Sequence, residues 1–116
     1  MATALSNLSD FNPEEVPSGQ NYKVAIVVAE WNSQITEGLF LGAKEALIAC
    51  GMEEDNILRS NVPGSFELVF GAKKALTKAV DAVIVIGSVI QGETKHFDFV
   101  CQGVTQGIVS LNLSSD

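Results

Sequence analysis

The stretch Lys23-Val24-Ala25-Ile26-Val27-Val28-Ala29 decides the fold that we predict for this chain. Six consecutive apolar residues follow the lysine, and no polar residue alternates with them. Such a run is typical of a β-strand that is covered on both faces, as in a parallel sheet with helices on each side. We therefore expect residues 23–29 to form a parallel strand of an α/β domain.

Helical and extended patterns alternate after this strand. Apolar residues at three- and four-residue spacing predict helices, and short apolar runs predict strands. The expected elements are helices 35–50, 69–79 and about 97–113, and strands 57–62 and 81–86. Ser33 is a candidate N-cap for the first helix, and Gly51 would end it. Three strands alternating with three helices predict right-handed crossovers and three α-β-α layers.

Composition limits the size of the protein and its partners. The chain has 116 residues, 47% of them hydrophobic, which suits one domain with a substantial core. Residues 1–21 are rich in Ser, Asn, Pro and acids and are expected to form an extended arm before an α/β domain at 22–116. Seven Lys and Arg against fourteen Asp and Glu give a net charge of -7, which disfavours long nucleic acids and anionic membrane surfaces.

The cysteines and the length of the apolar runs indicate the cellular compartment of the protein. No apolar run is long enough to span a bilayer, and the N-terminus lacks the pattern of a signal peptide. Cys50 and Cys101 are far apart in the chain. We therefore expect a cytoplasmic protein with reduced thiols.

Three unusual segments each follow a predicted strand. We name Glu30-Trp31-Asn32 the first loop, Pro63-Gly64-Ser65-Phe66-Glu67 the second loop, and residues 87–96 the third loop. In open parallel sheets, ligands bind outside the carboxyl ends of the strands. The three loops are therefore expected to converge on one site.

The third loop contains Gly87-x4-Gly92-Glu93-Thr94, close to the phosphate-binding loop of nucleotide hydrolases. Glu93 occupies the position of the required lysine and would repel a nucleotide's phosphates, so we reject that class. Backbone N–H groups near Gly92 and the Thr94 hydroxyl could still bind a small phosphate ester, with help from Lys95. The alternative is a tight strand-to-helix turn in which Thr94 is the N-cap and Glu93 is exposed.

His96 is the only histidine of the chain. An imidazole can accept and donate a proton near neutral pH, although a lone histidine in the first turn of a helix is often only a surface residue. Without a second histidine or a CxxC pattern, the sequence offers no metal site. No G-x-S-x-G elbow supports a Ser-His-Asp triad.

The other two loops offer a stacking surface and polar groups. Trp31 could stack on a heterocycle beside the amide of Asn32, or it could cover the first helix as a hydrophobic staple. Phe66 could belong to the core while Glu67 faces outward. Alternatively, Glu67 accepts hydrogen bonds from ligand hydroxyls.

These segments, together with Phe97-Asp98 and Gly103-Val104-Thr105-Gln106-Gly107, resemble the 6,7-dimethyl-8-ribityllumazine synthase family in order and spacing. The resemblance runs from about Tyr22 to Asn112. It implies a flavodoxin-like fold and condensation of 5-amino-6-(D-ribitylamino)uracil with 3,4-dihydroxy-2-butanone 4-phosphate. The products would be 6,7-dimethyl-8-ribityllumazine, phosphate and water, formed without a redox or metal cofactor in riboflavin biosynthesis.

The resemblance also implies roles for the loop residues. A stacking aromatic and the second loop would hold the pyrimidine and the ribityl chain: Trp31, Ser65, Phe66 and Glu67. Backbone groups of the third loop would bind the edge of the heterocycle: Ser88, Val89 and Ile90. Glu93 and Thr94 would contact the phosphate, and His96 would transfer protons.

Two departures from the family pattern add further expectations. The family usually has Phe where this chain has Trp31, whose larger face leads us to expect binding of riboflavin or FMN. The family also continues beyond Asn112 with another strand and further helices, so we expect a C-terminally truncated chain with an incomplete sheet. Members form pentamers or 60-subunit icosahedral shells in which neighbouring subunits share each site.

Two alternatives stay open at this point. One is the archaeal-type riboflavin synthase, a related family that dismutates two lumazines. The other is a shell or flavin-binding fragment without catalytic activity.

Overall fold

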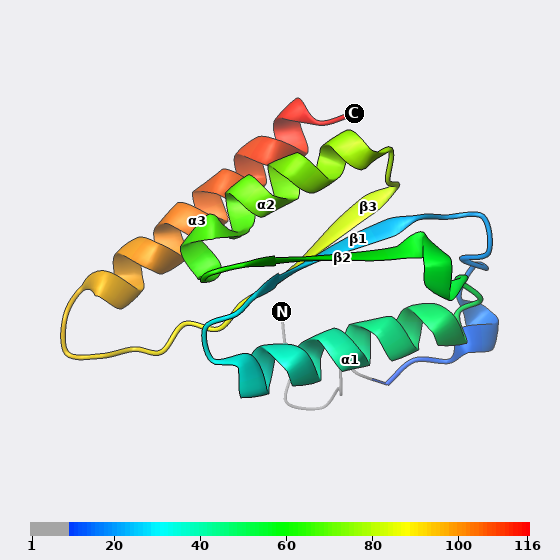
Figure 1. Cartoon of the computed structure of the whole chain (residues 1–116), viewed down its shortest axis with the longest axis horizontal. Coiled ribbons are helices and arrows are strands. Elements are labelled where there is room, and N and C mark those ends of the chain that lie inside the picture. Colours follow the sequence, from blue (N-terminus) through cyan, green and yellow to red (C-terminus); the bar gives the residue numbers. More distant parts are fainter. Residues whose placement is uncertain (1–9) are drawn as a thin grey trace.

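The computed structural model describes residues 10–116 and has three layers (Figure 1). Its parallel strands lie in the order β2-β1-β3 and are β1 (Val24–Ala29), β2 (Ile57–Val62) and β3 (Ala82–Ile86). Helix α1 (Ser33–Ala49) covers one face of the sheet. On the other face lie α2 (Leu68–Ala75) and, packed against it, α3 (His96–Ser114). This order begins the 2-1-3-4-5 order of flavodoxin-like sheets and confirms the α/β prediction.

Strand β1 is the centre of the sheet because every one of its side chains is buried. It pairs in register with both neighbours, Val24 opposite Ile57 on one side and Ala82 on the other. Alternate residues enter two cores. Val24, Ile26 and Val28 face α1, whereas Ala25, Val27 and Ala29 face α2. The apolar run at the start of the domain thus supplies both cores, as a doubly covered strand should.

Several element boundaries differ from those predicted. Ser33 is not the N-cap of α1: Asn32 occupies that position with a left-handed backbone, φ 59°. The second helix is α-helical only to Ala75 and then continues as a 3-10 turn at Leu76–Lys78. Ala79, with φ 55°, then redirects the chain toward β3. Gly51 does end the first helix, with φ 95°.

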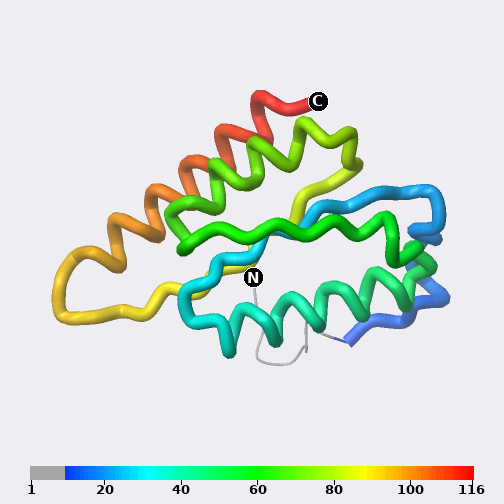
Figure 2. The backbone as a smooth tube through the Cα atoms, viewed as in Figure 1, coloured from blue at the N-terminus to red at the C-terminus, as the bar shows by residue number. Residues whose placement is uncertain are grey.

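The segment before β1 lies beside the C-terminal end of α1 (Figure 2). Among residues 10–21 there is one 3-10 turn, Pro13–Glu15, and the Gly19 N–H donates to the Cys50 carbonyl at 2.8 Å. The part of the predicted arm before Asp10 lies outside the described residues. Within residues 10–116, no helix is sufficiently long and apolar to cross a membrane.

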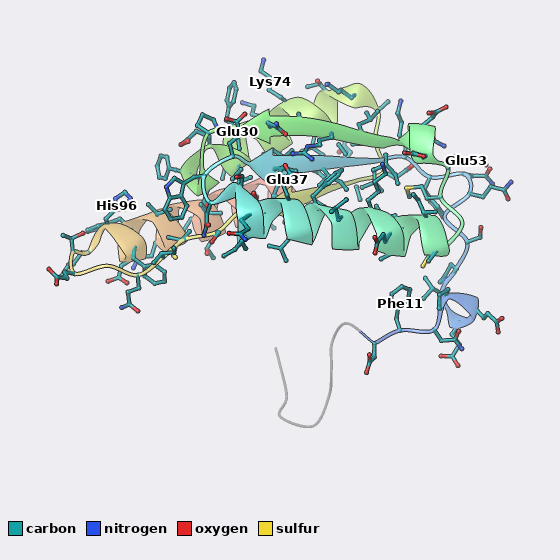
Figure 3. All side chains as sticks on the ribbon, turned by 60° about the horizontal axis from the view of Figure 1, so that its bottom comes forward. Phe11, Glu30, Glu37, Glu53, Lys74 and His96 are labelled. Carbon is teal, nitrogen blue, oxygen red and sulfur yellow. The ribbon has the colours of Figure 1, made fainter. Side chains whose placement is uncertain are left out.

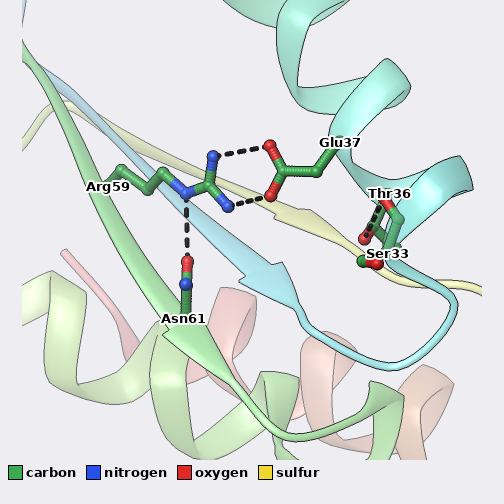
Figure 4. A network of polar contacts seen from close by, with 5 residues as sticks. All are labelled: Ser33, Thr36, Glu37, Arg59 and Asn61. Atoms are coloured by element: carbon green, nitrogen blue, oxygen red, sulfur yellow. Dashed lines mark hydrogen bonds and ion pairs between the residues drawn. The ribbon is translucent and has the colours of Figure 1, made fainter.

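An ion pair joins α1 to the edge strand β2 (Figure 4). The Arg59 guanidinium donates two hydrogen bonds to the Glu37 carboxylate and lies over the Phe40 ring, 4.3 Å from its centroid. Its Nε also donates to Asn61 Oδ1 at 3.0 Å. These hydrogen bonds lower the pKa of Glu37 and raise the pKa of Arg59. The pair therefore stabilises the side of the sheet opposite to α2 and α3.

Candidate active site

All three loops leave the sheet at the same end, the carboxyl ends of the strands (Figure 1). Between them lies a cavity of about 290 Å³, which we call the strand-end pocket. It is lined by Trp31, Gly64, Ser65, Phe66, Glu67, Ser88, Val89, Ile90, His96 and Val100. The convergence expected for a parallel sheet is therefore present. The lining includes all the predicted site residues except Asn32, Glu93 and Thr94.

Two backbone hydrogen bonds hold the first loop against the second. The Glu30 N–H donates to the Val62 carbonyl at 2.8 Å, and the Trp31 N–H donates to the Pro63 carbonyl at 3.0 Å. They prolong the pairing of β1 with β2 beyond the two strands. The Trp31 side chain is consequently held at the pocket, where it is 52% exposed and outside both cores.

A close contact holds the second loop against the third. The buried Ser65 hydroxyl donates to the Ser88 carbonyl at 3.3 Å. Gly87 lies next to this contact, because a Cβ at position 87 would be 2.5 Å from Ser65 Oγ and 2.8 Å from Leu68 Cδ1. Any side chain at position 87 would thus push the two loops apart. Because Gly87 has no side chain, it permits the second and third loops to approach each other this closely.

A side-chain bond connects the first loop to the third. Asn32 does not line the pocket, but its Nδ2 donates to Ser88 Oγ at 3.2 Å. Ser88 therefore accepts one hydrogen bond from each of the other loops.

The second half of the third loop extends away from the sheet before α3 begins (Figure 2). Glu93 and Thr94 lie there, exposed and outside the pocket lining. The N-cap position of α3 is Lys95, so the alternative with Thr94 as N-cap is wrong. The Thr94 hydroxyl nevertheless accepts a hydrogen bond from the His96 N–H at 3.3 Å. Glu93 and Thr94 therefore lie in the third loop, as predicted, but they do not form part of the pocket wall.

His96 is the first residue of α3 and is exposed at the pocket. Figure 3 shows it at the opposite end of the molecule from Glu53, which follows α1. Val100 lies one helical turn after His96 and also lines the pocket. Val100 was not among the predicted site residues and fell only within the predicted helix at about 97–113. Its four-residue spacing from His96 was the signal that could have identified it.

The Phe66 ring covers α3 from the pocket side. It is 63% exposed, so the prediction that it could belong to the core is wrong. A Cβ at Gly103 would lie 2.9 Å from Phe66 Cε1, which shows how closely the ring approaches the helix. Gly64, also in the lining, was part of the second-loop motif but was not singled out.

The chemistry of the strand-end pocket follows from these groups. It offers an aromatic face at Trp31, a carboxylate at Glu67, backbone groups of Ser88–Ile90, and one imidazole at His96. No group of three His, Cys, Asp or Glu residues between Asp10 and Asp116 is placed to hold a metal ion. The arrangement suits binding of a flat, hydroxylated heterocycle beside a residue that can transfer protons.

A second cavity, of about 530 Å³, lies between β3 and the C-terminal half of α3. Its lining includes Val83, Ile108 and Leu111, and it contains none of the predicted site residues. It lies toward the amino end of β3, away from the three loops. Although it is larger, it lacks both the aromatic face and the imidazole, and we therefore place the candidate site at the strand-end pocket.

Comparison with known proteins shows the family of the chain. The family model described as 6,7-dimethyl-8-ribityllumazine synthase matches residues 21–116. The chain belongs to the 6,7-dimethyl-8-ribityllumazine synthase family. The match confirms the resemblance and does not favour the archaeal-type riboflavin synthase alternative.

Curated members of this lumazine synthase family are similar along the whole chain. The 6,7-dimethyl-8-ribityllumazine synthase of Flavobacterium johnsoniae is 61% identical over 117 residues, which cover 100% of this chain and 62% of that protein. The synthase of Flavobacterium psychrophilum is 56% identical, with the same coverage. That of Christiangramia forsetii is 53% identical over 100% of this chain and 70% of its own length. The chain thus spans about three fifths of the length of the first two relatives.

Proposed function

We propose that this chain carries the lumazine synthase reaction, a transferase step of riboflavin biosynthesis. In it, 5-amino-6-(D-ribitylamino)uracil condenses with 3,4-dihydroxy-2-butanone 4-phosphate to give 6,7-dimethyl-8-ribityllumazine, phosphate and water. The observation that carries the proposal is the strand-end pocket, which gathers residues of all three loops in a member of this family. The proposed pathway is consistent with the relatives, which are named as lumazine synthases.

Within this proposal the pyrimidine stacks on Trp31. The second loop then faces the ring and the ribityl chain, where the Glu67 carboxylate accepts hydrogen bonds from hydroxyl groups. Backbone N–H and C=O groups of Ser88–Ile90 bind the edge of the heterocycle. The support is that these groups line one cavity, with an aromatic face and polar groups around it.

The phosphate of the second substrate would bind farther along the third loop, near Glu93 and Thr94. Both are exposed and lie just before His96. Backbone N–H groups at the start of α3 favour an anion there. His96 would then transfer protons during imine formation, phosphate elimination and ring closure.

Such a site accelerates the reaction mainly by positioning two substrates. Well-oriented reactants held together gain an entropic advantage on the order of several kcal/mol. Proton transfer by a side chain typically adds a factor of about 10² to 10⁴. The proposed mechanism needs no activated nucleophile.

We further propose partners for this chain. The face of Trp31 would also accept riboflavin or FMN, whose ring systems are flat. The chain would act as a homo-oligomer, a pentamer or a 60-subunit shell, with each site shared between subunits. It would act in the cytoplasm, where Cys50 and Cys101, both unpaired here, would stay reduced.

A steady-state assay with both substrates tests the proposal. We expect lumazine to form faster than in protein-free solution, and not at all when butanone phosphate is omitted. His96→Ala should reduce the rate, whereas Lys78→Ala, on the exposed 3-10 turn after α2, should leave it unchanged. A rate equal to the protein-free background would contradict the proposal and would favour a flavin-binding fragment if riboflavin still bound.

A further inference from the structure

Asn32 has an unusual backbone and an unusual use of its side chain. Its φ and ψ are 59° and 52°, in the left-handed region that few residues other than glycine adopt. It stands at the N-cap of α1, where an asparagine usually accepts a hydrogen bond from the helix backbone. Here the side chain makes no capping bond and instead donates from Nδ2 to Ser88 Oγ at 3.2 Å. The amide therefore connects two loops rather than closing its own helix.

Ser88 is the point where these connections meet. Its hydroxyl accepts from Asn32, and its carbonyl accepts from the Ser65 hydroxyl at 3.3 Å. The first and second loops are joined in turn by the bond from the Trp31 N–H to the Pro63 carbonyl. The three bonds form a closed circuit through all three loops that line the strand-end pocket.

The circuit runs through the pocket wall, because Ser65 and Ser88 line the pocket and only Asn32 lies outside the lining. Ser65 is only 9% exposed, and Asn32 and Ser88 are half-buried. Ser88, Val89 and Ile90 follow β3 without belonging to a helix or strand. Their backbone shape consequently depends on contacts such as those made by Ser88.

We propose that Asn32 is a positioning residue: through Ser88, its amide fixes the backbone of Ser88–Ile90 in the shape that receives the heterocycle. The inference rests on the proposed function, because that function supplies the ligand. Asn32 itself, which does not line the pocket, need not touch the substrate. If Ser88–Ile90 already have the binding conformation in the free protein, the ligand does not have to order them. The free-energy cost of binding is then smaller and the affinity is higher.

Loss of the bond should weaken binding by about fivefold, the factor that corresponds to one net hydrogen bond of roughly 1 kcal/mol. Asn32→Gly removes the amide and still accepts the left-handed backbone. Ser88→Ala removes the hydroxyl and keeps the carbonyl that Ser65 contacts. If both variants break the same bond, the double variant should bind no more weakly than either single one.

The readout is quenching of Trp31, the only tryptophan, by 5-amino-6-(D-ribitylamino)uracil. Gln34→Ala is the matched control, because it removes an exposed amide from the first turn of α1 and should leave the Kd unchanged. Thermal unfolding of every variant is recorded in parallel. The unmodified chain gives the reference Kd.

Each other outcome decides against the inference in a distinct way. A lower unfolding midpoint with an unchanged Kd would show a structural role only. A loss in Asn32→Gly that is absent from Ser88→Ala, or losses that add in the double variant, would show that Asn32 contacts the ligand directly. If saturating ligand does not quench the unmodified chain, the proposed function fails and the inference with it. Normal quenching with unchanged variants overturns the inference alone.

Discussion

Replacement of Gly87 by alanine should destabilise the protein, whereas the same replacement at Gly92 should not. The new Cβ at position 87 would lie 2.5 Å from Ser65 Oγ and 2.8 Å from Leu68 Cδ1. Those separations are about 0.9 and 0.6 Å shorter than an ordinary contact of 3.4 Å. Neither neighbour is free to move, since Leu68 is 3% exposed and Ser65 is 9% exposed. The added methyl must therefore displace the second loop or the core beneath it.

Overpacking of this kind typically costs about 1–3 kcal/mol, and we expect about 2 kcal/mol for Gly87→Ala. Gly92 lies in the same loop and would place its Cβ in open space. Its replacement should be neutral or stabilise by a few tenths of a kcal/mol, because alanine restricts the unfolded chain. Urea unfolding of both variants, with the slope m compared as a check on two-state behaviour, measures the difference. Equal midpoints for the two variants would refute the packing argument.

Three further predictions concern the core, the ion pair and the stacking face. Ile26→Ala, at a side chain that is 0% exposed, should cost about 3 kcal/mol in urea unfolding. Because Arg59 lowers the pKa of Glu37 in the folded state, the pair's stabilisation is complete above the carboxyl's unfolded pKa and is lost as pH falls through the folded pKa. The free energy of unfolding of the Glu37→Gln variant should thus fall less between neutral pH and about pH 3 than that of the unmodified protein, as measured by urea midpoints. Trp31→Ala should weaken riboflavin binding about tenfold, observed through riboflavin fluorescence, since stacking contributes about 1–3 kcal/mol per ring.

The parts of the fold that follow from periodicity were predictable from sequence. The unbroken apolar run of β1 reveals a strand covered on both faces, and helical spacing reveals α1 and α3. The convergence of the three loops follows from a general property of parallel sheets. Residues next to the ends of strands could therefore be placed at the pocket before any contact was known.

The predictions that failed concern features that depend on tertiary contacts. Ser33 was predicted as the N-cap, but Asn32 occupies that position, because sequence does not reveal that Asn32 adopts a left-handed backbone and bonds to Ser88. Glu93 and Thr94 lie outside the pocket lining because the third loop runs outward before α3 begins, and loop length alone does not set that path. Val100 was missed because an apolar residue on a helix predicts packing rather than ligand contact.

The central claim is that the strand-end pocket binds the substrates. Backbone amide chemical shifts recorded during titration with 5-amino-6-(D-ribitylamino)uracil test it most directly. We predict that the largest changes occur at Trp31, in the second loop and at Ser88–Ile90, with smaller ones at His96. Changes concentrated instead at Val83, Ile108 and Leu111, around the second cavity, would contradict the claim.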